Sequence, residues 1–191
     1  MENERRIDRT TSMGMDEHRL SDILHASQIK ATDIYETPPQ IIWIDNSTIA
    51  TLGNFSASTG KAKSKKTFNV SALVAASLAG KQVLNYRAHL PEGKQRILYV
   101  DTEQSRFHCR SVLERILRLA GLPTTTDPEN LDFFCLREYS PSVRIEVIDY
   151  ALRQQKGYGL VIIDGIRDLM LDINNAVSYT HLRAHETTLH L

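Results

Sequence analysis

Three short apolar segments recur along the chain, and each is separated from the next by a stretch long enough to form a helix. They are RILYVD (96–101), LDFFCL (131–136) and GLVIID (159–164). The stretches between them, 105–123 and 140–157, have apolar residues at helical spacing and a glycine near the end, which is typical of helices. Continuous apolar strands that alternate with helices predict an α/β fold with a doubly wound parallel sheet, which helices cover on both faces.

A similar unit precedes the first of these strands. IIWI (41–44) and NFSAST (54–59) are predicted strands, and the alanine-rich TFNVSALVAASLAGK (67–81) is a predicted buried helix. Ligands of such sheets bind at the carboxyl ends of the strands. Three polar stretches are therefore expected to share one rim: GKAKSKKT (60–67), DTEQS (101–105) and IIDG (162–165).

GKAKSKKT is close to the phosphate-binding pattern G-x-x-x-x-G-K followed by serine or threonine, but Lys65 replaces the second glycine. Backbone amides at the start of a helix bind anions, Lys66 would reach the β- and γ-phosphate oxygens of ATP, and the Thr67 hydroxyl would bind Mg²⁺. The Cβ of Lys65 matters only if the loop requires a positive φ there. The alternative is a solvated basic turn. The predicted nucleotide-binding residues are Gly60, Lys61, Ala62, Lys63, Ser64, Lys65, Lys66 and Thr67.

Two acids follow predicted strands. Asp164 ends the apolar run LVIID, and a carboxylate there would bind Mg²⁺ opposite Thr67; the alternative is an ordinary turn aspartate. Glu103 lies just past its own strand, where it would orient and deprotonate the water that attacks the γ-phosphate, with Lys66 as its catalytic partner. Asp101 competes for that role, and Glu103 could also be a helix N-terminal acid.

The composition of the chain limits the classes of function that it can have. The net charge of +0 over 191 residues gives no overall positive charge that would indicate binding to nucleic acid or membrane. The longest apolar run, 70–80, is shorter than the roughly 20 residues that cross a bilayer. Cys109 and Cys135 have no metal-ligand spacing and fit a reducing cytoplasm. Residues 1–38 are polar and predicted to be a flexible lead-in, with one short helix at 19–29.

These motifs together resemble the RecA-like P-loop ATPases. LYVDTEQS (98–105) is similar to their strand with the catalytic glutamate, and LVIIDGIRDL (160–169) is similar to their Mg²⁺-binding strand. GNFSASTGKAKSKKTF (53–68) with IIDGIRDLMLDIN (162–174) resembles, more narrowly, the RepA-like and DnaB-like AAA-family ATPases of bacterial mobile elements. The resemblance covers about residues 38–176, and it implies that 39–176 belong to such a domain.

The resemblance implies an ATPase that uses ATP and Mg²⁺ and acts on DNA in replication, unwinding or mobilisation. It also implies a homo-oligomeric ring in which the neighbouring subunit supplies an arginine finger. Two other functions stay open at this point. One is a nucleotide-binding regulatory or scaffold module without turnover, and the other is a P-loop kinase of a small molecule.

The end of the chain departs from this pattern. VSYTHLRAHET (177–187) resembles the translation of a sequencing-library adapter, so residues 177–191 are predicted to be a non-native tail. In RecA-like folds a later strand lies between the strand before the phosphate loop and the strand of Asp164. We therefore expect the chain to lack this strand, and to be marginally stable and inactive by itself.

Overall fold

The computed structural model describes residues 17–59 and 65–170, and the chain divides into a unit of residues 1–37 and a unit of residues 38–191. The first unit contains α1 (Glu17–Ser27), close to the short helix predicted there. Predictions for Gly60–Ser64 and for the tail at 177–191 lie outside the described residues. The second unit contains β1 (Gln40–Ile44), β2 (Ser47–Thr51), α2 (Lys66–Ala79), β3 (Tyr86–Ala88), β4 (Arg96–Asp101), α3 (Arg106–Ala120), β5 (Leu131–Cys135), α4 (Pro141–Gln154), β6 (Tyr158–Asp164) and the 3₁₀ turn η1 (Ile166–Leu169).

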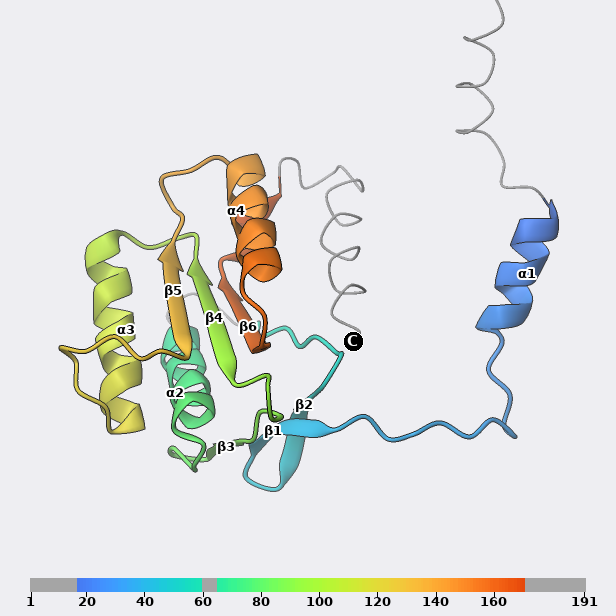
Figure 1. Cartoon of the computed structure of the whole chain (residues 1–191), viewed down its shortest axis with the longest axis horizontal. Coiled ribbons are helices and arrows are strands. Elements are labelled where there is room, and N and C mark those ends of the chain that lie inside the picture. The colour runs from blue at the N-terminus through green and yellow to red at the C-terminus, as the bar shows by residue number, and fades with distance from the viewer. Residues whose placement is uncertain (1–16, 60–64, 171–191) are drawn as a thin grey trace, which may run out of the picture. The chain divides into compact units, whose positions relative to one another are not determined.

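A parallel sheet of three strands organises the second unit, with the order β5-β4-β6 (Figure 1). At its carboxyl edge Asp101 of β4 is in register with Cys135 of β5 and with Asp164 of β6. The three strands therefore end level, and the residues that follow them share one rim. Within 17–59 and 65–170, β6 pairs with β4 alone, so one of its edges has no partner strand there.

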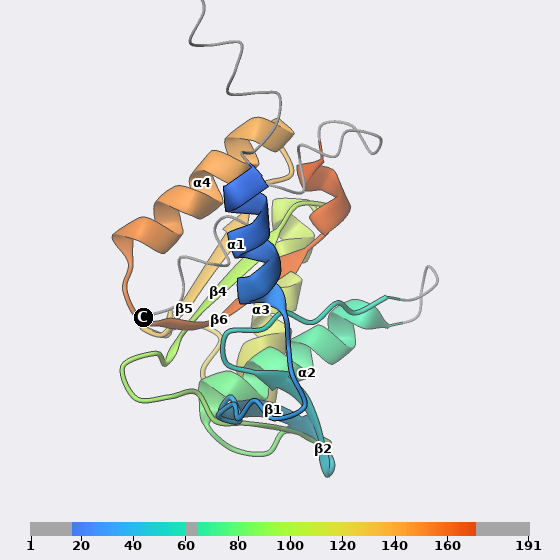
Figure 2. The same ribbon diagram turned by 90° about the vertical axis from the view of Figure 1, so that its right-hand side faces the viewer.

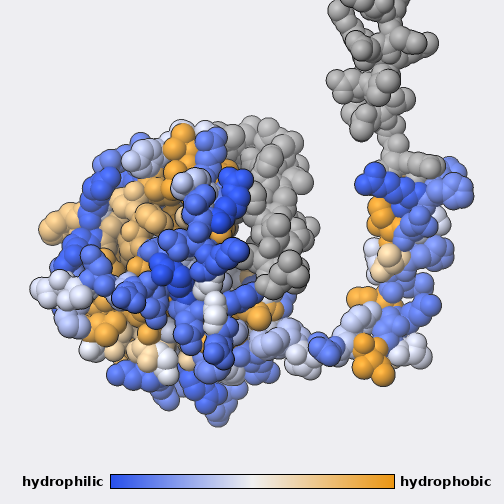
Figure 3. Space-filling model, viewed as in Figure 1, coloured by the Kyte–Doolittle hydropathy of each residue, from blue (hydrophilic) through white to orange (hydrophobic). Residues whose placement is uncertain are grey.

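Helices cover both faces of this sheet, which confirms that part of the sequence prediction. Alternate residues of β4 point to opposite faces: Ile97 and Tyr99 join a core with α2 and α3, whereas Leu98 and Val100 join one with α4 and η1. All four side chains are fully buried. Figures 1 and 2 show α4 on one side of the strands and α2 and α3 on the other. In Figure 3, apolar side chains reach the surface between α3 and α4, beside the strand β5.

A second sheet holds the amino-terminal strands of this unit, and its order β2-β1-β3 is antiparallel throughout. IIWI is a strand as predicted, but it pairs with β2 and β3 and does not belong to the parallel sheet. The turn into β2 begins at Asp45, whose φ of 50° is one that aspartate tolerates better than most residues.

The prediction of a strand at 54–59 is wrong. The nearest strand before the phosphate-binding pattern is β2, which ends at Thr51. In the segment that follows, the side-chain amide of Asn54 donates to the hydroxyl of Thr51 at 2.7 Å. The hydroxyl of Ser56 donates to the backbone carbonyl of Ile49 at 2.7 Å. Short polar side chains that bond locally to the backbone compete with strand pairing, and a run such as NFSAST is rich in them.

The predicted helices all form, with the expected boundaries. α2 ends before Gly80 and α3 before Gly121, and both glycines have a left-handed conformation. Pro141 is the first residue of α4. None of the helices in the described parts of the chain is long and apolar enough to span a membrane.

Candidate functional site

Predicted site residues from three segments meet at the carboxyl rim of the parallel sheet. The Thr67 hydroxyl, in the first turn of α2, donates to the Asp164 carboxylate at the end of β6 over 3.4 Å. The same oxygen of Asp164 accepts from the Tyr99 hydroxyl of β4 at 3.1 Å. Lys66 begins α2, and its positive charge opposes part of the upward pKa shift that desolvation gives Asp164 and Glu103. The structure thus brings Thr67 into contact with Asp164, with Lys66 and Glu103 on the segments beside them.

A tight turn after β4 presents Glu103. Asp101, which is fully buried, caps this turn: one carboxylate oxygen accepts from the backbone amides of Glu103 at 3.0 Å and Gln104 at 2.7 Å. The other oxygen accepts from the side-chain amide of Gln104 at 2.7 Å. Because both oxygens of Asp101 are occupied in the turn, the exposed Glu103 is the better placed of the two acids to meet a ligand.

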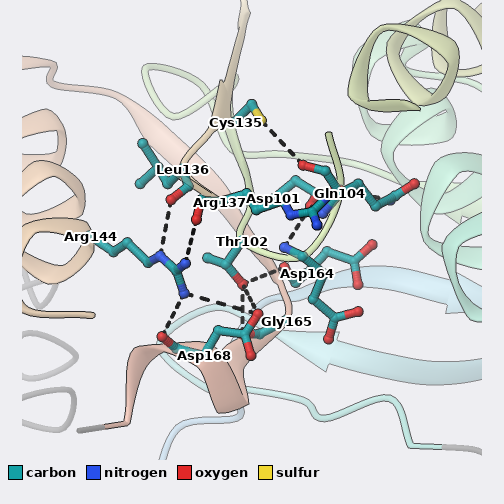
Figure 4. Close-up of polar contacts among 11 residues, drawn as sticks. Asp101, Thr102, Gln104, Cys135, Leu136, Arg137, Arg144, Asp164, Gly165 and Asp168 are labelled. Atoms are coloured by element: carbon teal, nitrogen blue, oxygen red, sulfur yellow. Dashed lines mark hydrogen bonds and ion pairs between the residues drawn. The ribbon is translucent and has the colours of Figure 1, made fainter. Parts of the chain in front are cut away.

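The Glu103 turn lies directly against the end of β6 (Figure 4). The hydroxyl of the buried Thr102 is 2.8 Å from the carbonyl oxygen of Gly165 and 3.1 Å from that of Asp164. Gly165 has a φ of 97°, and a Cβ there would come within 2.2 Å of the Thr102 hydroxyl and 2.6 Å of Cγ of Glu103. Only glycine therefore allows this close approach.

The rim carries an excess of negative charge. Burial raises the pKa of Asp164, as does the charge of Asp101, while hydrogen bonds from Tyr99 and Thr67 and the charge of Lys66 oppose the shift. Partial desolvation against the end of β6 raises the pKa of the otherwise exposed Glu103, and the charges of Asp168, Asp164 and Asp101 raise it further. Such a rim attracts a cation, and a carboxylate of raised pKa is a stronger base.

The residue that breaks the phosphate-binding pattern has an unusual backbone. Lys65 is the N-cap of α2, with φ 59° and ψ 25° in the left-handed region. A side chain costs about 1–2 kcal/mol in that conformation, which glycine adopts freely. The Cβ of Lys65 therefore matters, because the backbone has a positive φ at the position where the phosphate-binding pattern has glycine.

Replacing Lys65 by glycine is expected to stabilise the chain by about 1 kcal/mol, since the strain of a left-handed side chain disappears. The measurement is the free energy of unfolding in urea. Lys66→Gly is the matched control: Lys66 is helical, so the same change is expected to destabilise by about 0.5–1 kcal/mol. Equal effects of the two substitutions would contradict the strain at Lys65.

The oxygen ligands available at the rim fit Mg²⁺. Among residues 17–59 and 65–170, no three His, Cys, Asp or Glu side chains are arranged to hold a metal by themselves. Mg²⁺, however, is usually held by one or two carboxylates together with phosphate oxygens and waters. The Asp164 carboxylate and the adjacent Thr67 hydroxyl are such a pair, next to the helix start where phosphates would lie.

The comparisons with known proteins agree with this geometry. A family model described as an AAA domain matches residues 20–179. The chain belongs to the AAA domain family. This membership implies nucleotide binding and hydrolysis in general, and the rim just described lies inside the AAA domain. No curated protein and no solved structure matches the chain.

Sequence reasoning missed several residues of the AAA domain rim. The sequence predicts only a strand position for Tyr99 and a turn position for Thr102. It predicts no site role for Asp168 or Arg144. Thr102 and Asp168 lie within stretches that the sequence singled out, 98–105 and 160–169, so polar residues near the two acids were a usable signal. Arg144 had no such signal, because it reaches the rim from the first turn of α4, outside the stretches singled out.

Proposed function

We propose that this AAA domain binds ATP with Mg²⁺ and hydrolyses it at the carboxyl rim of the parallel sheet. The observation that carries the proposal is the convergence of four side chains, each of a type that this chemistry needs, from three separate segments. They are an ammonium and a hydroxyl at a helix start, a half-buried carboxylate at a strand end, and an exposed carboxylate on a capped turn, namely Lys66, Thr67, Asp164 and Glu103.

Each residue has a defined part in the proposed reaction. The first amides of α2 and the Lys66 ammonium bind the phosphate oxygens. Thr67 and Asp164 would hold Mg²⁺, which when bound offsets the negative charge of the β- and γ-phosphates. Glu103 orients a water molecule and accepts its proton as the water oxygen bonds to the γ-phosphorus and the bond to the ADP oxygen breaks. The positive charge of Lys66 only partly opposes the raised pKa that desolvation and the neighbouring carboxylates give Glu103.

Within this proposal, the cellular role is a DNA-handling motor in replication, unwinding or mobilisation, acting as a ring. Its support is the resemblance of 98–105 and 160–169 to the RecA-like ATPases. A second candidate is a nucleotide-binding regulatory module without turnover. The left-handed Lys65 favours it, because a lysine side chain at that loop position changes the geometry around the γ-phosphate. DNA-stimulated hydrolysis would separate the motor from the regulatory module.

Lys66→Met is the direct test. Loss of a charge-assisted bond of about 1.5–3 kcal/mol should weaken the binding of a fluorescent ATP analogue by about 10- to 150-fold. The matched control is Lys81→Met, at an exposed lysine just after the other end of α2. Binding and hydrolysis are measured on the same protein, and hydrolysis is measured with and without single-stranded DNA. Equal affinity in both variants would contradict the site, and tight binding without hydrolysis would favour the regulatory module.

A further inference from the structure

Arg144 of α4 has a largely buried side chain, and it takes no part in the proposed reaction. Its side chain is 11% exposed. Three nitrogens of its guanidinium donate to backbone carbonyls: to Leu136 at 3.0 Å, to Asp168 at 2.8 Å and to Arg137 at 2.7 Å (Figure 4). A planar guanidinium suits such a set of acceptors because its donors are fixed relative to one another.

The carbonyls that Arg144 binds belong to two different strand ends. Leu136 and Arg137 directly follow β5, and Asp168 lies in η1 directly after β6. Leu136 is also joined to the central strand, because its amide donates to the carbonyl of Asp101 at 2.8 Å. One side chain thus connects the segments that follow β5 and β6, on the face of the sheet opposite α2.

Asp168 carries the connection onward to the turn of Glu103. Its carboxylate is 4.0 Å from the Arg144 guanidinium and 3.4 Å from the Thr102 hydroxyl. Thr102 immediately precedes Glu103 and also contacts the carbonyl of Gly165. Because Gly165 lies too close to Thr102 and Glu103 to admit even a methyl group, η1 cannot shift toward this turn without displacing it.

We propose that Arg144 is a positioning residue, which holds the Glu103 carboxylate in its working orientation through Asp168 and Thr102. The inference rests on the proposed ATP hydrolysis and deepens it, since it assigns a function to a residue of α4, which packs on the face of the sheet opposite α2. A purely structural arginine would lower stability when replaced and change binding and turnover together. Replacement of a positioning residue lowers turnover but leaves nucleotide affinity unchanged. Affinity is unchanged because Lys66 and Thr67 belong to α2, which packs on the other face of the sheet.

The variants that test it are Arg144→Lys and Thr102→Val, singly and combined. Arg144→Lys keeps the positive charge but cannot bond three carbonyls in one plane. Misplacement of a reacting group commonly costs about 100-fold in rate, so we expect single-turnover hydrolysis to fall by about 10- to 100-fold, with analogue affinity within about two-fold. Arg153→Lys, at an exposed arginine of the same helix, is the matched control and should change neither.

The combined variant tests whether the two residues act through one connection. If they do, Arg144→Lys should add little to the loss already caused by Thr102→Val, whereas independent effects would multiply. Multiplying effects would overturn the path through Thr102. A parallel loss of affinity and turnover in Arg144→Lys, matched by its loss of stability, would overturn the positioning function.

Amide hydrogen exchange provides a reading that needs no hydrolysis. The amides of Glu103 and Gln104 are bonded to Asp101, and Arg144→Lys should accelerate their exchange while Arg153→Lys should not. Unchanged exchange would contradict the inference. Failure of the proposed function appears separately, as absence of ATP binding and hydrolysis in the unsubstituted protein.

Discussion

Replacing Glu103 by glutamine is expected to lower ATP hydrolysis by about 100- to 10,000-fold while ATP still binds. Glutamine has the size of glutamate but cannot accept a proton from water. The turn itself should persist, because it is built by the Asp101 carboxylate and the backbone amides of residues 103 and 104. Neither contact involves the side chain that is replaced. The measurement is single-turnover hydrolysis beside the affinity for a fluorescent ATP analogue.

The control for this experiment lies on the same rim. Glu138 is an exposed acid three residues after the end of β5, and Glu138→Gln makes the same chemical change beside the neighbouring strand. It should hydrolyse ATP at the unsubstituted rate. If Glu103→Gln retained full hydrolysis, the base would have to be sought elsewhere. If it lost nucleotide affinity to the same extent as turnover, Glu103 would be a binding residue.

Much of the parallel sheet could be predicted because its signals are local. Each strand is a short apolar run, and each helix after it ends near a glycine that the structure shows in left-handed conformation, at Gly80 and Gly121. Parallel strands end at a common rim, so the level ends of β4 and β6 at Asp101 and Asp164 could be predicted. These are features that the chain specifies without reference to distant partners. Thr67 reaches Asp164 from the start of α2, which follows a strand of the other sheet.

The antiparallel sheet of β1, β2 and β3 could not be predicted in the same way. IIWI is apolar enough for either sheet, and nothing within four residues states which strands it will pair with. The outcome depends on β3, a strand of three residues too short to be recognised from its sequence. NFSAST alternates weakly, but the side chains of Asn54 and Ser56 bond back to Thr51 and Ile49 of β2, and 54–59 is not a strand.

At the site, residue types were predictable and their connections were not. The pattern showed that Lys65 replaces a glycine, but the sign of its φ is a property of the folded loop. Arg144 and Thr102 are 42 residues apart in sequence and are joined through Asp168, which belongs to a third element. Such chains of contacts exist only after the helices have packed on the sheet, and no local spacing reports them.

Replacing Asp164 by asparagine is expected to have opposite effects on activity and on stability. Loss of the carboxylate that would hold Mg²⁺ should reduce hydrolysis by at least about 10- to 100-fold, the loss that removal of an outer partner of a metal site already causes. Without nucleotide or Mg²⁺, however, the variant should unfold at a higher temperature at pH 7. Asparagine can still accept hydrogen bonds from Tyr99 and Thr67, and it carries no charge to bury.

The pH dependence of that stability has a definite sign. Burial raises the pKa of Asp164 in the folded chain, so the folded state binds a proton more tightly than the unfolded state does. The stability that this proton contributes is complete below the ordinary aspartate pKa of about 3.9 and is lost as the pH rises through the folded value. The advantage of Asp164→Asn should therefore be largest at neutral pH and vanish in acid, which thermal unfolding across that range would measure.

Asp132→Asn is the matched substitution with the opposite expectation. Asp132 of β5 is paired with Arg96 at 2.7 Å and accepts from the Tyr158 hydroxyl at 2.5 Å, so losing its charge should lower the unfolding temperature. If Asp164→Asn were also destabilising at pH 7, the contacts of Asp164 would outweigh its burial, and the carboxylate would serve the fold. If the two substitutions differ in sign, the Asp164 carboxylate lowers the stability of the fold, as expected for a residue whose charge serves ligand binding.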